Sequence, residues 1–192
     1  MTRLWWVRHG PTHEKCFTGW RDVPADLSDT ALIGRVADFL PTDAVVVASD
    51  LQRASTTADA IGGNRQRLPD QRDLREMHFG IWDGMHHTDV AARDPVLSRA
   101  FWETPGDLRA PEGESWHDVS ARVARVVDDL TLRFAGGDIV LVAHMGVIMT
   151  QIQRAAGCTA YQAMGHQIDN LSVTQMTCSQ SGWALGAVNH LP

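Results

Sequence analysis

The chain has 192 residues, of which 44% are hydrophobic and 21% are charged, and its formal net charge at pH 7 is -6. A chain of this length can bury a sizeable core, and we expect a single domain over residues 1–192. The acidic balance argues against a nucleic-acid-binding protein, which needs a basic face. The apolar stretch Leu4–Val7 near the N-terminus is broken by Arg8, so it is too short for a signal peptide or a membrane span.

The three cysteines, Cys16, Cys158 and Cys178, are far apart in the sequence and form no C-x-x-C pair. An odd number of dispersed cysteines argues against a disulfide framework and is typical of a reducing compartment. We therefore expect a cytoplasmic protein with no membrane partner.

Short apolar runs predict three strands that are buried on both faces, because none of the runs alternates with polar residues. They are Leu4–Val7, Val45–Ala48 and Ile139–Ala143. Two further strands are expected at 171–177 and 183–188, where they would form a hairpin at the edge of the sheet.

Helical segments separate these strands. Apolar residues recur at helical spacing after Ser115, which is a good N-cap, and the pair Gly136-Gly137 ends that helix. Further helices are predicted at 30–40, 52–61 and 146–156. The alternation of strand and helix indicates a three-layer α/β/α fold with a mostly parallel central sheet.

The regular pattern dissolves over about 77–111, where Gly, Pro, Asp and Arg are scattered among aromatic residues. Such a composition is typical of irregular connections rather than of a strand or a long helix. We interpret this segment as a lid-like excursion over one end of the sheet, with one short helix.

Each buried strand is followed by residues suited to binding an anion. Arg8 and His9 follow the first strand, Arg53 comes shortly after the second, and His144 follows the third. Ligands of open α/β sheets bind outside the carboxyl ends of the strands, so these side chains should converge on one crevice. One guanidinium group can bind two phosphate oxygens at once through two parallel N–H donors, and helix N-termini add backbone donors. The sequence therefore predicts a site for a phosphate dianion.

Five segments, in order and spread over nearly the whole chain, resemble the signatures of the histidine phosphatase superfamily. The resemblance implies a phosphoglycerate mutase-like fold. Asparagines also occur near the C-terminus at positions where that family tends to have them, Asn170 and Asn189. The five segments are Arg8-His9-Gly10-Pro11-Thr12; Ser49 to Ala54 with Thr57-Ala58; Leu74-Arg75-Glu76 with Gly80 and Trp82-Asp83-Gly84; Pro111 to Ser115; and Ala143-His144 with Gly146-Val147-Ile148.

The resemblance also implies a role for each polar residue of the crevice. His9 would attack phosphorus and carry the phosphoryl group as phosphohistidine. Arg8, Arg53 and His144 would bind the equatorial oxygens. These donors would stabilise the transferring group directly, so we expect no metal and no other cofactor.

Glu76 would act as the general acid and base. It would protonate the leaving alkoxide and then deprotonate the water that releases phosphate. Glu112 and Glu114 are rivals for this role. Both lie beside a helix start, where carboxylates usually cap the helix or interact with its dipole, so Glu76 is the favoured residue.

The first loop departs from the family pattern. Pro11 replaces a common glutamate, and Glu14 and Lys15 stand where the family has a Trp-Asn pair, so an asparagine that often contacts phosphate is absent. Met145 replaces a residue that is usually Gly or Ala. These departures bear on the choice of substrate more than on the reaction. The candidate substrate-binding residues are Thr12, Lys15, Thr18, Gly19 and Met145.

The predicted function is a phosphatase that hydrolyses a small phosphomonoester, a phosphorylated metabolite. Phosphoglycerate mutase-type phosphoryl transfer, an α-ribazole phosphatase and a non-catalytic phosphate-binding homologue remain as alternatives. Mutases of the family tend to have a longer excursion and a longer tail than this chain, and a non-catalytic homologue would be free to lose one of the five polar residues. No nucleic-acid partner is expected, and the sequence leaves open whether the protein is a monomer or a homodimer.

Overall fold

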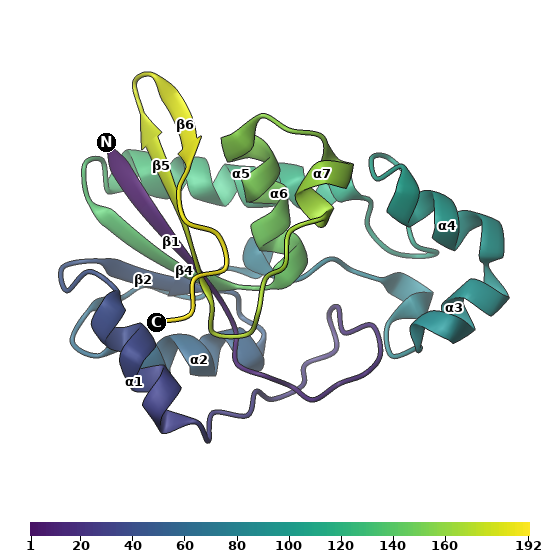
Figure 1. Cartoon of the computed structure of the whole chain (residues 1–192), viewed down its shortest axis with the longest axis horizontal. Coiled ribbons are helices and arrows are strands. Elements are labelled where there is room, and N and C mark those ends of the chain that lie inside the picture. The colour runs from purple at the N-terminus through teal and green to yellow at the C-terminus, as the bar shows by residue number, and fades with distance from the viewer.

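The computed structural model describes residues 1–192 as a six-stranded sheet with helices on both faces (Figure 1). Across the sheet the strand order is β3-β2-β4-β1-β5-β6. The pairs β3–β2, β2–β4 and β4–β1 are parallel, whereas β5 pairs antiparallel with both β1 and β6. The predicted three-layer α/β fold, with a mostly parallel sheet and an edge hairpin, is confirmed. The strands are β1 (Thr2–Arg8), β2 (Val45–Ala48), β3 (Gln66–Arg67), β4 (Asp138–Ala143), β5 (Val173–Ser179) and β6 (Gly182–Leu185).

Local signals define the ends of the longer helices. Ser115 caps α5, since its hydroxyl accepts the Asp118 N–H at 3.2 Å while the Asp118 carboxylate accepts the Ser115 N–H at 2.8 Å. At the end of α6, Gly157 adopts the left-handed conformation with a φ of 62°. The helices are α1 (Thr30–Phe39), α2 (Gln52–Gly62), α3 (His87–Arg93), α4 (Pro95–Glu103), α5 (Trp116–Arg133), α6 (Met145–Ala156) and α7 (Ala160–Met164).

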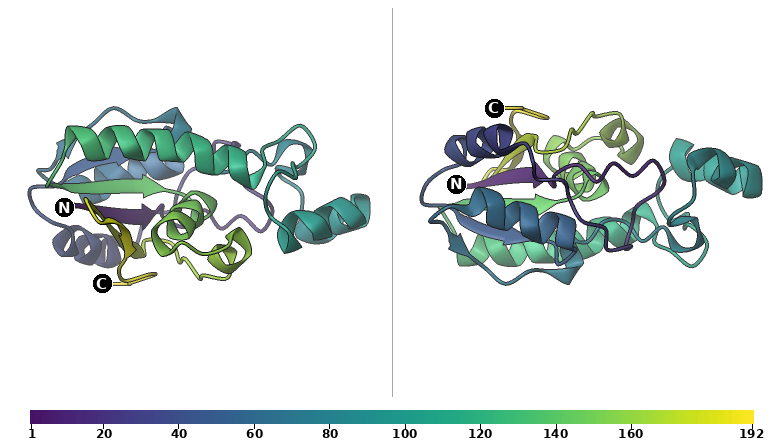
Figure 2. Two further views of the ribbon diagram at one scale, coloured as in Figure 1. Left: turned by 90° about the horizontal axis from the view of Figure 1, so that it is seen from above. Right: turned by 90° about the horizontal axis from the view of Figure 1, so that it is seen from below.

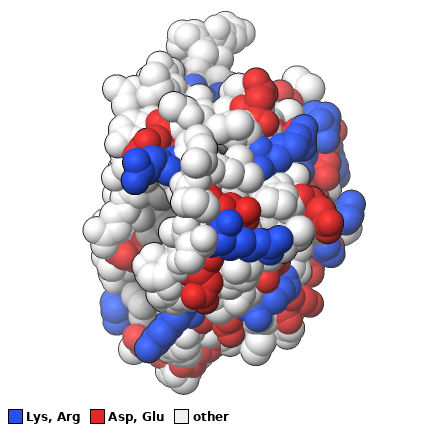
Figure 3. All heavy atoms as spheres, turned by 90° about the vertical axis from the view of Figure 1, so that its right-hand side faces the viewer, with Lys and Arg blue, Asp and Glu red and all other residues white.

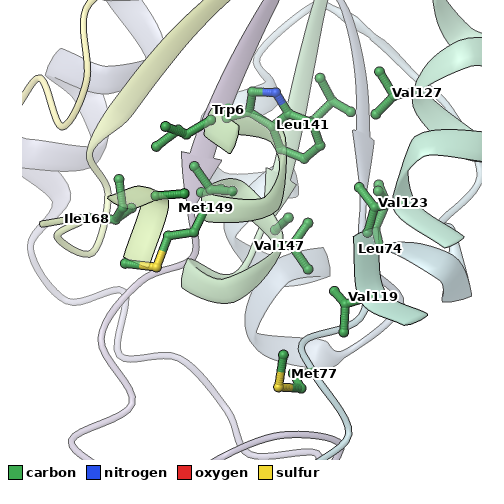
Figure 4. Packing of buried hydrophobic residues seen from close by; sticks show 14 of the residues in the cluster. Trp6, Leu74, Met77, Val119, Val123, Val127, Leu141, Val147, Met149 and Ile168 are labelled. Carbon is green, nitrogen blue, oxygen red and sulfur yellow. The ribbon is translucent and has the colours of Figure 1, made fainter. Parts of the chain in front are cut away.

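The alternation of side chains along the strands builds two hydrophobic clusters, one on each face of the sheet. On one face, Leu4 and Trp6 of β1 pack with residues of α5 and α6. On the other face, Val7 packs with residues of α1 and α2. Figure 4 shows the first cluster, in which valines of α5 lie near Trp6 and Leu141. Because helices cover both faces, both sets of strand side chains are apolar, which explains the unbroken runs in the sequence.

The segment 77–111 contains two helices, α3 and α4, so the prediction of one short helix there was wrong. Pro95 separates them: it has no N–H to continue α3, and its fixed φ suits the first turn of α4. Figure 2 shows both helices at the end of the molecule toward which β1 and β4 point. The sequence also gave no sign of β3 or α7, which at two and five residues are too short to display a period. No helix has the length and apolarity needed to cross a membrane.

Candidate active site

Two histidines lie side by side because β1 and β4 are parallel neighbours. The register pairs Val7 with Val142 and Arg8 with Ala143, so the next residues of the two strands, His9 and His144, are brought level. Their ring centroids are 5.1 Å apart. A cavity of about 200 Å³ opens at this end of the sheet. Four of the five predicted catalytic residues line it: Arg8, His9, Arg53 and Glu76.

The ring of His9 is held in one tautomer. Its Nδ1 lies 2.7 Å from the carbonyl oxygen of Gly10, and because a carbonyl can only accept, Nδ1 carries the hydrogen. Burial and the positive charges of Arg53 and Arg8 lower the pKa of His9 to about 3. The ring is therefore neutral at pH 7, with the lone pair on Nε2.

The backbone around His9 is fixed by two side chains. The amide of Asn170 donates to the His9 carbonyl at 2.8 Å. The Gly10 N–H donates to the hydroxyl of Thr57 at 3.0 Å, and that hydroxyl donates in turn to the Arg53 carbonyl at 2.6 Å. This chain of hydrogen bonds ties the loop after β1 to the first turns of α2.

The positive charge of the site is buried. Arg53 is 1% exposed, and burial lowers the pKa of both Arg53 and Arg8 from the ordinary arginine value. One nitrogen of Arg8 donates to the Ile168 carbonyl at 2.6 Å, while its Nε is buried without a partner. On the surface at this end, by contrast, basic and acidic side chains are interspersed (Figure 3). The cations of the site are thus separate from the surface charge and placed to receive an anion.

His144, the fifth predicted catalytic residue, is fully buried beside the ring of His9 and is not among the residues that line the cavity. Neither ring nitrogen has a hydrogen-bond partner in the protein, which is unusual for a buried imidazole. Burial and the nearby His9 and Arg53 hold the pKa of His144 well below its usual value, so the ring is neutral. A neutral imidazole with an unsatisfied N–H is a hydrogen-bond donor for a ligand oxygen.

Glu76 is 8% exposed, and both of its oxygens accept backbone hydrogen bonds. The Met77 N–H donates to Oε1 at 2.9 Å and the Gly146 N–H to Oε2 at 3.1 Å. A Cβ at position 146 would lie 2.5 Å from Oε1, so a larger residue there would displace the Glu76 carboxylate from this position. The rivals Glu112 and Glu114 do not line the cavity.

The candidate substrate-binding residues divide into two groups. Lys15 is exposed and does not line the cavity. Gly19 is buried, and both its backbone groups are engaged: its N–H donates to Asp83 at 3.0 Å, and its carbonyl accepts from Arg53 at 2.7 Å. Its backbone therefore helps to hold Arg53 instead of facing a ligand. The residues of the other group line the cavity: Thr12, Thr18 and Met145.

One backbone donor at the N-terminus of each of two helices is also occupied. The Gln52 N–H at the start of α2 donates to the Asp22 carboxylate at 2.7 Å, and the Gly146 N–H in α6 donates to Glu76. No group of three or more His, Cys, Asp or Glu side chains is close enough together to hold a metal ion.

Arg122 on α5 is a residue of the site region that sequence reasoning missed. It is buried and donates to the carbonyls of Asp73, Arg75 and Glu76 at 2.7–2.9 Å. It also forms two hydrogen bonds with the Glu114 carboxylate, at 2.8 and 2.9 Å. Arg122 thereby fixes the segment that carries Glu76. Its signal in the sequence was an arginine on the apolar face of a helix.

Asp83 is a second residue whose contacts the sequence did not predict. Its carboxylate accepts the N–H groups of three consecutive residues at 2.9–3.1 Å: Gly19, Trp20 and Arg21. Two carbonyls of this loop accept hydrogen bonds from Arg53, at 2.7 and 2.9 Å. Asp83 therefore positions Arg53 through the loop between them.

Comparison with known families agrees with this geometry. Residues 4–191 match the histidine phosphatase superfamily, branch 1. The chain belongs to this superfamily.

The relatives found for this histidine phosphatase superfamily member include phosphatases. An adenosylcobalamin/alpha-ribazole phosphatase of Escherichia coli is 32% identical over 177 residues, which cover 85% of this chain and 83% of the relative. A bifunctional protein of Mycobacterium tuberculosis is 31% identical over 192 residues, covering 91% of this chain. The match spans 50% of that relative, so this chain corresponds to about half of its length.

A solved structure of a mycobacterial glucosyl-3-phosphoglycerate phosphatase in complex with VO3 has the same fold. It superposes with a TM-score of 0.83 at 28% sequence identity, and the match covers 97% of this chain and 98% of the other. The fold expected from the sequence is thus shared with this solved phosphatase structure.

We expect the free energy of unfolding to fall as the pH falls from about 6.5 toward 3, in part because of His9. Its pKa of about 3 in the folded chain lies below the ordinary value of 6.5, so in this interval the unfolded chain binds a proton that the folded chain does not. One such group contributes a slope of up to about 1.4 kcal/mol per pH unit.

Urea unfolding between about pH 6 and about pH 5 would measure this slope. His9→Gln is expected to reduce it by about 1 kcal/mol per pH unit. The exposed His87 supplies the matched control, and His87→Gln is expected to keep the slope of the original chain. An unchanged slope in His9→Gln would show that the histidine is not held neutral by its surroundings.

Arg122→Met is expected to lower the free energy of unfolding by about 3–5 kcal/mol, because it leaves Glu114 without its cation and the carbonyls of Asp73 and Arg75 without donors. Arg125 lies on the same helix, but its side chain is 68% exposed and 3.6 Å from Asp73. Arg125→Met should therefore cost less than about 1 kcal/mol. Urea unfolding of both variants checks this, and similar losses would mean that the Arg122 contacts contribute little.

Proposed function

We propose that this chain is a metal-independent phosphatase that hydrolyses a small phosphomonoester, with His9 as the nucleophile. The observation that carries the proposal is the tautomer of His9. Donation from Nδ1 to the Gly10 carbonyl leaves the Nε2 lone pair free, and the low pKa keeps the ring neutral. A neutral imidazole whose free nitrogen lies beside two guanidinium groups is suited to attack a bound phosphoryl group.

Arg8 and Arg53 bind the equatorial oxygens of the phosphoryl group in this proposal, and His144 donates one further hydrogen bond. Arg53 is buried and Arg8 is half-buried, and carbonyl oxygens hold both guanidinium groups, so they need little reorganisation when negative charge develops. They supply the positive charge that a metal ion would otherwise provide. A bound dianion would also raise the pKa of His144 and strengthen its donation.

Glu76 completes the proposed reaction. Nε2 of His9 forms a bond to phosphorus as the P–O bond to the leaving group breaks, and the protonated Glu76 transfers its proton to the departing oxygen. Water then attacks the phosphohistidine, giving a proton back to Glu76 as the P–N bond breaks and inorganic phosphate forms. Among the three acids considered, Glu76 alone lines the cavity with His9, which supports this assignment.

Hydrolysis is favoured over transfer to a second hydroxyl group by the charge of the site. Arg8 and Arg53 are the only basic side chains that line the catalytic cavity, apart from His9 itself. A phosphoglycerate carries a carboxylate as well as a phosphate, and no third cation is available to bind it. The names of the Escherichia coli and mycobacterial relatives also support a phosphatase. We place the activity in the cytoplasm because all three cysteines are unpaired.

Glu76→Gln tests the two-step reaction. General acid catalysis typically contributes about a hundred- to ten-thousand-fold in rate, so we expect a loss of this size with an alkyl phosphate. With p-nitrophenyl phosphate the leaving group needs little protonation, so the phosphoenzyme should still form while its hydrolysis becomes limiting. Stopped-flow absorbance should show a burst of about one equivalent of p-nitrophenol and then slow turnover.

His9→Ala is the control, and it should show neither burst nor turnover. Labelled substrate should give an acid-labile, base-stable adduct in the original chain and none in His9→Ala. An adduct that survives His9→Ala would move the nucleophile elsewhere. Equal slowing of burst and alkyl phosphate hydrolysis in Glu76→Gln would remove Glu76 as the leaving-group acid.

Metal independence predicts that chelators leave the rate unchanged, whereas orthovanadate, which mimics five-coordinate phosphorus, inhibits it. The mycobacterial relative was solved with VO3 bound, which makes vanadate a suitable probe. Steady-state rates before and after dialysis against a chelator would test this. Loss of activity that added zinc or magnesium restores would contradict the metal-free reaction.

A further inference from the structure

A second cavity, of about 250 Å³, adjoins the catalytic cavity. The two cavities share four residues of their walls: Glu76, Phe79, Trp102 and Met145. The second cavity has a mainly apolar wall built from the excursion, α5, α6 and α7. Its other apolar side chains include Met77, Phe101, Leu108, Trp116, Met149 and Met164. It therefore opens beside the proposed general acid and continues away from His9.

The charge of this second cavity restricts what it can bind. No lysine, arginine or histidine lines it, and Glu76 is its only ionisable side chain. A carboxylate or a second phosphate placed there would lose its hydration without gaining a cation, and it would lie near the Glu76 carboxyl group. An apolar group, by contrast, gains free energy by leaving water for such a wall.

We propose, on the basis of the function proposed above, that this cavity binds the leaving group. The substrate class is then a phosphate monoester of an alcohol that carries an apolar group of aromatic size. In-line attack places the leaving oxygen on the side of phosphorus opposite His9, where Glu76 protonates it. Since Glu76 belongs to both cavities, the remainder of the alcohol extends into the apolar one.

The size and the side chains of the cavity fit this class. An apolar cavity of about 150 Å³ binds benzene in another protein, so about 250 Å³ accommodates a ring and a short linker. Met77 and Met149, both labelled in Figure 4, come from the segment after Leu74 and from α6. Methionine side chains are flexible and polarizable, and they pack well against aromatic rings.

Trp102 lies in the walls of both cavities. Its ring stacks on Phe17 with centroids 5.7 Å apart and planes 15° apart, and it lies 6.4 Å from the ring of Phe79. Three aromatic rings from separate parts of the chain therefore meet at the junction. An aromatic leaving group that passes this junction contacts ring faces before it reaches the methionines.

Binding and turnover should be measured with matched compounds on the full chain. The binding probes are ethylphosphonate, 2-phenylethylphosphonate and 2-carboxyethylphosphonate, which cannot be hydrolysed, and calorimetry gives their Kd values. The turnover probes are ethyl phosphate and 2-phenylethyl phosphate, whose alcohols have similar acidity. We expect the phenylethyl compound to bind about 10-fold tighter or more than the ethyl compound, with a similar gain in kcat/KM. The carboxyethyl compound should bind no better than ethylphosphonate.

Two variants test whether the preference for the phenylethyl compound comes from the apolar cavity. Leu108→Arg and Met164→Arg place a cation in the apolar wall, and each should reduce the phenylethyl-to-ethyl preference to less than about 3-fold. Leu132 is 79% exposed on α5 and lines neither cavity, so Leu132→Arg is the matched control and should keep the preference.

Each outcome is decisive for one of the two proposals. Equal binding of the phenylethyl and ethyl phosphonates, or tightest binding of the carboxyethyl compound, overturns the inference while leaving the phosphatase proposal intact if the esters are hydrolysed. If both arginine variants keep the preference for the phenylethyl over the ethyl compound, the apolar group binds outside this cavity. Tighter binding of the phenylethyl phosphonate without hydrolysis of either ester supports the subsite and overturns the phosphatase function.

Discussion

The parallel pairing of β1 with β4 is the constraint on which the rest of the site depends. Its register brings His9 level with His144 at the carboxyl ends of the strands, and the His9 N–H donates to the Ala143 carbonyl at 3.0 Å. A shift by one residue would turn each strand residue to the opposite face of the sheet. Hydrophobic burial on both faces prevents such a shift, since Trp6 and Val7 must each meet their own cluster. The packing of the core thus fixes the position of the proposed nucleophile.

Burial of the two guanidinium groups has a cost that the surrounding loops offset. Removing a cation from water is unfavourable unless it is hydrogen-bonded, and Arg53 obtains its partners from the loop that Asp83 holds. The unliganded site therefore keeps positive charge in place, with unsatisfied donors on Arg8 and His144. Such a site is prepared for an anion before the anion arrives. Burial, together with these charges, lowers the pKa of His9 and keeps its ring neutral.

The segment from Glu76 to Pro111 supplies both the proposed general acid and part of the wall of the apolar cavity. Its first residue lines both cavities, and Arg122 anchors the backbone there from α5. Further along, α4 contributes Phe101 and Trp102 to the apolar wall. Because loops vary more easily than core strands, this arrangement would let the proposed alcohol subsite change while the proposed phosphoryl-binding residues stay at the ends of the strands and on α2.

The sequence by itself determined the strand and helix pattern, the fold class and the order of the motifs. Unbroken apolar runs report burial on both faces, and the capping residues Ser115 and Gly157 act within a few residues along the chain, so both can be recognised locally. The strand ends also predicted that His9, Arg53 and His144 would converge, because parallel strands end at one edge.

Only the tertiary structure decided how the candidate residues are used. Lys15 and Gly19 lie in the same loop after His9, yet Lys15 is exposed, while Gly19 is buried with both backbone groups engaged by Asp83 and Arg53. The low pKa of His9, the anchoring of Glu76 by Arg122 and the apolar cavity arise from contacts between segments distant in the chain. The periodicity of the sequence does not predict such contacts, because they depend on how the helices, strands and loops pack against one another.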